Sequence, residues 1–292
     1  MMKTVKGLLR AITPYGLLEL RRKMIDRPRQ IPPNSARALF HEERRHRIAS
    51  ALTSTEDSGG SLHGEDYESV VNFIVHRGVS HVHAVEGSIS KDSLAFIQKH
   101  VCENLPRSGH PVALHIGNFL GVSLVYIAGF LTRLDEESLV IAIDPNLPHR
   151  GVSNPQDHVA ALVCACGLQK NIIILAGYSG RKNVSNDGVV FESYDPGDEF
   201  GREYACEETL RNLRKIVSAK FDVVIMDGNH EADYLVCEIK SALHVMKPGS
   251  LLVLDDVNDA WDEIRDVFLT IDSLGLIPLA SDGRVGIAQV KC

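Results

Sequence analysis

The sequence VALHIGNFLGVSLVYIA, residues 112–128, joins an apolar run, a turn bounded by two glycines and a second apolar stretch. The first run predicts a buried strand, and Gly117 and Gly121 allow the backbone of the turn to approach a ligand closely. Ser123 opens the second stretch, a predicted helix whose N-terminal amides favour a carboxylate. The spacing is G-x-x-x-G, which differs from the G-x-G-x-x-G of dinucleotide enzymes.

Four further apolar runs, rich in β-branched residues, predict strands at residues 138–144, 171–177, 221–228 and 250–256. Segments with helical spacing lie between them, and in residues 231–246 the apolar positions recur at intervals of four, four and three. Near-continuous apolar strands that alternate with helices are typical of a Rossmann-like, doubly wound α/β fold. Its mostly parallel sheet carries helices on both faces. Upstream, residues 65–78 and 91–105 predict two helices with a loop, residues 81–90, between them.

Composition and charge divide the chain into a basic N-terminal extension, residues 1–61, and a domain, residues 62–292. The chain has 292 residues with 44% hydrophobic and 24% charged content, which is enough for one full core. Residues 1–50 hold 12 Lys and Arg against 4 Asp and Glu, although the whole chain has a net charge of −7. We expect the extension to contact an anionic membrane surface or another subunit of a homo-oligomer, or to pack as a solvated arm. Because the domain is acidic, nucleic acid is not an expected partner.

The sequence favours a cytoplasmic location. It has no run of eighteen uncharged apolar residues, and charges interrupt its first 23 residues too often for a secretory signal. The six cysteines lack C-x-x-C spacing, so we expect reduced thiols with packing roles.

Two more predicted strands end in residues suited to a nucleotide-like ligand, since doubly wound sheets bind ligands at the carboxyl ends of their strands. Asp144 ends the second strand, where an acid can accept both hydroxyls of a ribose. The third strand runs into AGYSG, residues 176–180, whose small residues suit an adenine pocket. A turn glycine or a helix-capping acid would explain each signal alone, but their order favours a ligand site. The Gly-, Asn- and Asp-rich residues 178–202 predict a long loop over an acceptor site.

Three aspartates at the last two strand ends predict a metal site. Asp227 ends the fourth strand, and Asp255 and Asp256 end the fifth, 28 residues further on. Like charges repel, and three carboxylates on one rim suit a hard divalent cation such as Mg²⁺. The alternative is that these aspartates cap helices. His230 follows Asp227 by three residues and is a candidate base, or a histidine that binds backbone at a helix start.

Several segments resemble class I S-adenosylmethionine-dependent methyltransferases, and more narrowly the catechol O-methyltransferase and macrocin or novobiocic-acid sugar O-methyltransferase group. Besides residues 112–128, the likeness rests on EGSISKDSLAFI (86–97), IAIDPN (141–146), MDGNH (226–230) and KPGSLLVLDD (247–256). The resemblance implies a seven-stranded sheet and methyl transfer from S-adenosylmethionine to a hydroxyl of a sugar or catechol-like small molecule, assisted by Mg²⁺.

The resemblance also implies residue roles. Gly117, Gly121 and Ser123 would lie near the methionine part of the cofactor, Asp144 on the ribose and Ser179 near the adenine. The remaining expected cofactor-binding residues are His115, Asn118, Tyr178 and Asp227. Asp227 and His230 are the expected catalytic residues, and Asp227, Asp255 and Asp256 the expected metal ligands.

His115 departs from the family pattern, which usually has Glu or Asp at this position. An acid there helps to organise the methionyl ammonium group, so the histidine changes how the amine is held. The alternative function is therefore a catalytically degenerate methyltransferase fold that serves as a binding or scaffold module.

Overall fold

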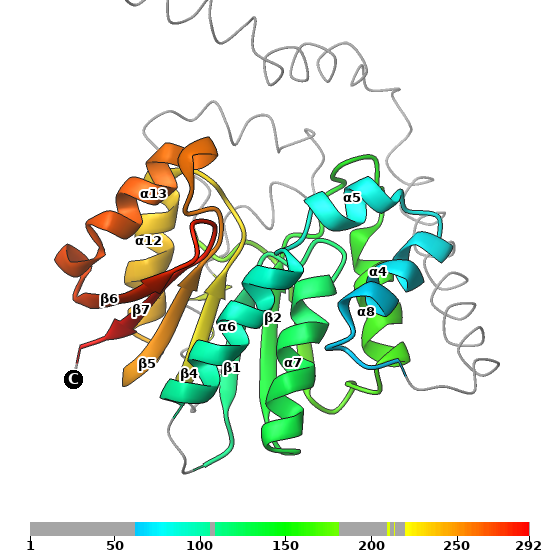
Figure 1. Ribbon diagram of the computed structural model, residues 1–292, viewed down its shortest axis with the longest axis horizontal. Helices are drawn as coiled ribbons and strands as arrows, with labels where there is room; N and C mark the ends of the chain where they lie inside the picture. Colours follow the sequence, from blue (N-terminus) through cyan, green and yellow to red (C-terminus); the bar gives the residue numbers. More distant parts are fainter. Residues whose placement is uncertain (1–61, 106–108, 181–208, 211–212, 214–219, 292) are drawn as a thin grey trace, which may run out of the picture. The chain divides into compact units, whose positions relative to one another are not determined.

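The computed structural model describes residues 62–105, 109–180, 209–210, 213 and 220–291. It contains one seven-stranded sheet with the strand order β3-β2-β1-β4-β5-β7-β6 (Figure 1). All neighbouring strands from β3 to β5 pair in parallel, whereas β7 pairs antiparallel with both β5 and β6. The predicted Rossmann-like, doubly wound, mostly parallel sheet is therefore confirmed.

The five strands predicted from apolar runs are all present. They are β1 (Val112–Ile116), β2 (Leu139–Asp144), β3 (Ile172–Ala176), β4 (Phe221–Met226) and β5 (Met246–Leu254). The last two strands, β6 (Leu276–Ser281) and β7 (Gly286–Val290), form an antiparallel pair at one edge. The apolar runs did not predict these two strands, which only the family resemblance implied.

Two hydrophobic clusters hold helices against the two faces of the sheet. One cluster joins β1, β2, β4 and β5 to the helices α4 (Tyr67–His76), α6 (Lys91–Asn104), α7 (Val122–Leu134) and α8 (Pro155–Ala165). The other joins the opposite side chains of these strands to α12 (Ala232–Leu243) and α13 (Asp262–Leu269). Successive residues of a strand face opposite ways, so nearly every residue of β1 and β4 is buried.

The segment between α4 and α6 differs from its prediction. Residues 81–90 were expected to form a loop, but His81–Glu86 form the short helix α5. Ser80 accepts a hydrogen bond from the backbone N–H of His83 and so caps α5. Ser80, a residue type that favours helix starts, is the sequence signal that could have predicted α5. Two 3-10 turns, η2 (Asp259–Trp261) and η3 (Ile271–Leu274), flank α13.

Some expectations concern residues outside the described ranges. They are the basic extension, residues 1–61, and residues 181–202 of the predicted loop. Within the described ranges, no helix is both long and apolar enough to cross a membrane. The four described cysteines, Cys102, Cys164, Cys166 and Cys237, are free thiols. Burial raises the pKa of the Cys166 thiol to about 12, which fits a packing role.

Candidate functional site

The carboxyl ends of β1, β2, β4 and β5 meet at one rim of the sheet. The backbone N–H of Asp227 donates to Ile116 O at 2.9 Å, and that of Asp255 donates to Met226 O at 3.0 Å. The chain reverses its strand order between β1 and β4, which is where doubly wound sheets place their ligands. The prediction that these strand ends lie on one rim of the sheet is therefore confirmed.

Gly117 and Gly121 shape the turn between β1 and α7. Both adopt positive φ, 83° and 86°, a conformation that side chains disfavour. A Cβ on Gly117 would lie 1.8 Å from the carbonyl oxygen of Asp227, so only glycine lets the ends of β1 and β4 approach this closely. Ser123 is buried in the first turn of α7. The turn leaves backbone N–H groups at the start of this helix.

Asp144 holds this turn in place through backbone hydrogen bonds. Its Oδ2 accepts from the N–H groups of Asn118 at 2.6 Å and Phe119 at 3.1 Å, and its Oδ1 accepts from Asn146 N–H at 2.6 Å. Burial raises the pKa of the Asp144 carboxyl, and these three hydrogen bonds oppose the rise. The predicted ribose contact would add to this structural role.

His115 and Asn118 are neighbours at this turn, and both side chains carry buried polar atoms. His115 is fully buried and Asn118 is 4% exposed. Burial lowers the pKa of His115 to about 4, and the neighbouring Asn118 side chain opposes this shift only in part. Neither ring nitrogen of His115, nor either side-chain amide atom of Asn118, has a well-formed hydrogen bond among the described residues. Buried polar atoms are nearly always paired, so this arrangement fits a bound polar ligand.

Ser179, predicted near an adenine, belongs to a buried polar cluster with α12. Its hydroxyl lies 3.0 Å from the Tyr234 hydroxyl and donates a short hydrogen bond to Glu238. Burial raises the pKa of Glu238 to about 8, while the Ser179 hydrogen bond opposes the rise. Tyr178 is also buried at this end of β3. Sequence reasoning missed Tyr234 and Glu238, although their i, i+4 spacing places both on one face of α12.

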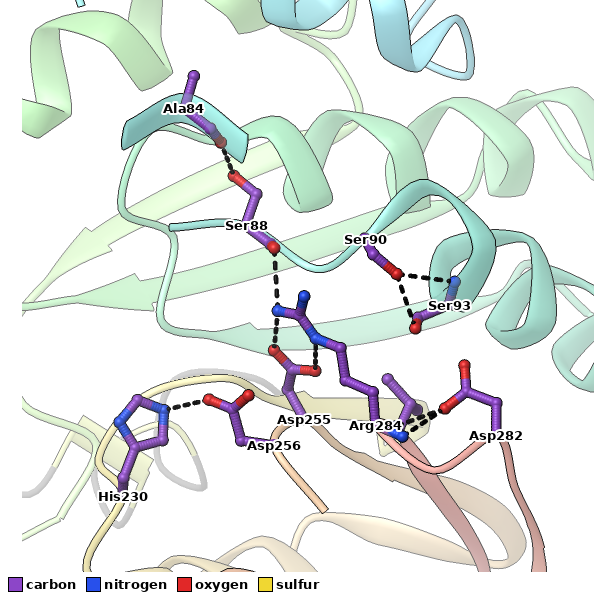
Figure 2. Close-up of polar contacts among 10 residues, drawn as sticks. Ala84, Ser88, Ser90, Ser93, His230, Asp255, Asp256, Asp282 and Arg284 are labelled. Carbon is purple, nitrogen blue, oxygen red and sulfur yellow. Dashed lines mark hydrogen bonds and ion pairs between the residues drawn. The ribbon is translucent and has the colours of Figure 1, made fainter. Parts of the chain in front are cut away.

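Beside the end of β5, an arginine in the turn between β6 and β7 supplies a positive charge. Arg284 Nε donates to Asp255 Oδ1 at 3.0 Å, and its Nη2 donates to Asp255 Oδ2 at 2.9 Å (Figure 2). The Asp255 side chain is 2% exposed. Burial raises the pKa of Asp255 and the Arg284 hydrogen bonds oppose this. Sequence reasoning missed Arg284, because nothing in the turn SDGRVG indicates a distant partner.

Asp256 turns toward His230, as Figure 2 also shows. The His230 Nε2 lies 2.9 Å from Asp256 Oδ2, and the imidazole stacks on Trp261 with a centroid distance of 4.3 Å. Burial would raise the pKa of Asp256, but His230, Arg284 and Asn258 together lower it. Asp256 has φ of 59°, an uncommon backbone conformation for a residue other than glycine.

Asp227 is half-buried, its backbone carbonyl lies against Gly117, and its carboxyl interacts with Asp255, Asp256 and Arg284. Burial and the charges of Asp255 and Asp256 raise its pKa well above the ordinary value, and Arg284 opposes this. A carboxyl with a raised pKa accepts a proton readily, which is the property of a general base near neutral pH.

The expected Mg²⁺ centre does not fit this arrangement. The described residues contain no group of three or more His, Cys, Asp or Glu side chains placed to hold a metal ion. The fold does bring Asp227, Asp255 and Asp256 to one rim. However, Asp255 pairs with Arg284 and Asp256 pairs with His230, so protein side chains already occupy two of the three expected ligands.

Comparison with known proteins supports the class suggested by the fold. A family model described as a methyltransferase domain matches residues 114–257, just under half of the chain. A search of curated protein sequences finds no match. The matched segment begins in β1 and ends just after Asp256, so it contains the carboxyl ends of β1, β2, β4 and β5 but not Arg284.

Two solved structures share the fold. An O-methyltransferase from Bacillus cereus in complex with SAH has 14% sequence identity and a TM-score of 0.51, with 83% of this chain and 97% of that chain covered. An SAH-bound methyltransferase from Podospora anserina has 13% identity and a TM-score of 0.50, with 91% and 100% covered. The described part of the chain therefore shares the fold of these two methyltransferases, and residues 114–257 match the model of a methyltransferase domain.

Proposed function

We propose that this protein transfers the methyl group of S-adenosylmethionine to a hydroxyl oxygen of a small acceptor such as a sugar or catechol-like molecule. The observation that carries the proposal is the pair of buried side chains His115 and Asn118 beside the glycine turn, whose polar atoms make no well-formed hydrogen bond within the described part of the chain. The SAH bound to both similar proteins supports the same ligand class here.

The cofactor would bind along the rim. The β1–α7 turn and the start of α7 offer N–H groups to its carboxylate, and His115 and Asn118 offer polar atoms to its amino acid part. Asp144 would take the ribose, and Tyr178 and Ser179 would lie near the adenine. S-Adenosylmethionine supplies an activated methyl group on a sulfonium sulfur.

In the reaction, the acceptor oxygen forms a bond to the methyl carbon while the carbon–sulfur bond breaks and its electron pair stays on sulfur. The hydroxyl proton must leave to a nearby base. Asp227 fits this role because its pKa is raised, and His230 with Asp256 is a second proton acceptor on the same rim. The main contribution of the fold is to hold the two reactants in line.

Calorimetry with SAH tests the cofactor site. His115→Leu removes both ring nitrogens but keeps an apolar side chain, so we expect SAH affinity to fall about tenfold while the melting temperature holds or rises. His244→Leu, at the exposed end of α12, is the matched control and should leave both unchanged. If the parent does not bind SAH, the proposed function is wrong.

One observation favours the alternative of a fold that binds without turnover. The His115 imidazole is neutral or positively charged, so it cannot offer the negative charge that an acid gives to the methionyl ammonium group. A parent that binds SAH but methylates none of a broad panel of hydroxylated compounds would favour this binding or scaffold role.

A further inference from the structure

The three aspartates of the rim need a compensating positive charge. Adjacent carboxylates in a partly desolvated site repel one another, and the fold must offset this repulsion to bring the ends of β4 and β5 together. We propose that Arg284 is the built-in cation of this rim, that it takes the place of a divalent metal, and that the rim works without a metal ion.

The side chain of Arg284 engages Asp255 through two parallel hydrogen bonds of 3.0 and 2.9 Å. This forked geometry matches a carboxylate and is stronger and more directional than a single ion pair. Both Asp255 oxygens are therefore held by the guanidinium. A metal ion at Asp255 would lie beside a fixed positive charge.

The backbone around Arg284 holds the guanidinium in this position (Figure 2). The Arg284 N–H donates to Asp282 Oδ1 at 2.8 Å, and Val285 N–H donates to the same oxygen at 2.6 Å. The Arg284 carbonyl accepts from Val257 N–H at 2.6 Å. Backbone hydrogen bonds thus hold Arg284 both within the β6–β7 turn and to the segment after Asp256.

A third contact extends the role of Arg284 beyond Asp255. Its Nη2 donates to Ser88 O at 2.9 Å, and Ser88 Oγ donates back to Ala84 O at 2.8 Å. Arg284 therefore ties the segment between α5 and α6 to the rim of the sheet. A metal bound only by the three aspartates would not make this connection.

The charge of Arg284 is permanent under ordinary conditions. Burial alone would lower the pKa of the guanidinium, but Asp255, Asp256 and Asp227 together hold it above its ordinary value. With Arg284 on Asp255 and His230 on Asp256, each β5 carboxylate already has its own partner. The proposal that Arg284 compensates the charge of the aspartates does not depend on the proposed function. Its consequence, methyl transfer without a metal, rests on that function.

Thermal unfolding of the full chain tests the proposal, with EDTA, Mg²⁺, Mn²⁺ or Ca²⁺ added to separate samples. We expect the melting temperature of the parent to be the same in all four. Arg284→Ala should melt at least about 4 °C lower in EDTA, because it leaves the buried Asp255 without its partner and removes the positive charge beside Asp227 and Asp256. Mg²⁺ or Mn²⁺ should restore part of this loss, and Asp255→Asn in the Arg284→Ala background should abolish the recovery.

Arg265→Ala is the matched control, because Arg265 pairs on α13 with the highly exposed Asp259. It should change melting little and gain no metal response. Saturable stabilisation of the parent by a metal, abolished by Asp255→Asn, would overturn the proposal. So would an Arg284→Ala protein that ignores all metals, since the aspartates would then have no capacity for a metal that Arg284 could replace.

If Arg284→Ala does not fold, Arg284→Met keeps the apolar stem and takes its place, and calorimetric titration of the parent with Mn²⁺ decides the outcome. SAH binding is measured separately in EDTA. Failure of the parent to bind SAH would refute the proposed function. The melting experiment with metals would still test the role of Arg284.

Discussion

Replacing Glu238 by glutamine should change how the stability of the protein depends on pH. Glu238 is 1% exposed on α12, and burial raises the pKa of its carboxyl from 4.5 to about 8. The unfolded chain loses this proton near pH 4.5, whereas the folded protein keeps it until about pH 8. Between these values the folded state binds one more proton. The contribution of Glu238 to the free energy of unfolding therefore falls as pH rises through this window.

The size of the effect follows from the pKa shift. Each pH unit inside the window changes the free energy of unfolding by about 1.4 kcal/mol, so the change from pH 5 to pH 8 is about 4 kcal/mol. Glutamine is neutral throughout and can still hydrogen-bond to Ser179. We expect Glu238→Gln to be close to the parent at pH 5 and more stable by about 4 kcal/mol at pH 8.

Urea unfolding at pH 5, 6, 7 and 8 measures the difference. Glu263→Gln, at an exposed position in α13, is the control and should follow the parent at every pH. Parallel pH profiles for the parent and Glu238→Gln would show that Glu238 is ionised in the folded protein, and the reasoning from burial would then be wrong.

Two further predictions concern the glycine turn. Asp144→Ala should weaken SAH binding by about 1.5 to 3 kcal/mol, and it should also lower the melting temperature because three backbone N–H groups lose their acceptor. Unchanged SAH affinity by calorimetry would remove Asp144 from the cofactor site. Gly117→Ala should abolish SAH binding, because its Cβ would meet the Asp227 carbonyl oxygen at 1.8 Å. Gly167→Ala is its control, with a similar φ of 69° and open space around the Cβ, and it should cost stability alone. Equal effects of the two alanines on SAH binding would contradict the close-approach argument.

Much of the fold was predictable because it follows from local patterns. Buried parallel strands need near-continuous apolar runs, so β1 to β5 were visible in the sequence, and their alternation with helices fixed the class. Strand ends on one rim follow from parallel pairing, which is why Asp227, Asp255 and Asp256 were expected on the same rim. The strands β6 and β7 lie at the sheet edge with mixed burial, so their apolar pattern is weaker.

The partners of the charged residues were decided only by the tertiary structure. Arg284 is 29 residues from Asp255 and 196 from Ser88 along the chain, and no local spacing links them. β7 lies antiparallel between β5 and β6. This pairing brings the β6–β7 turn to the rim where β5 ends, next to Asp255. The burial of Glu238 likewise depends on the end of β3 packing near α12. The sequence by itself determined that three carboxylates gather at this rim. Long-range strand pairing decided that an arginine meets them, because pairing, unlike periodicity, joins segments that are distant in the chain.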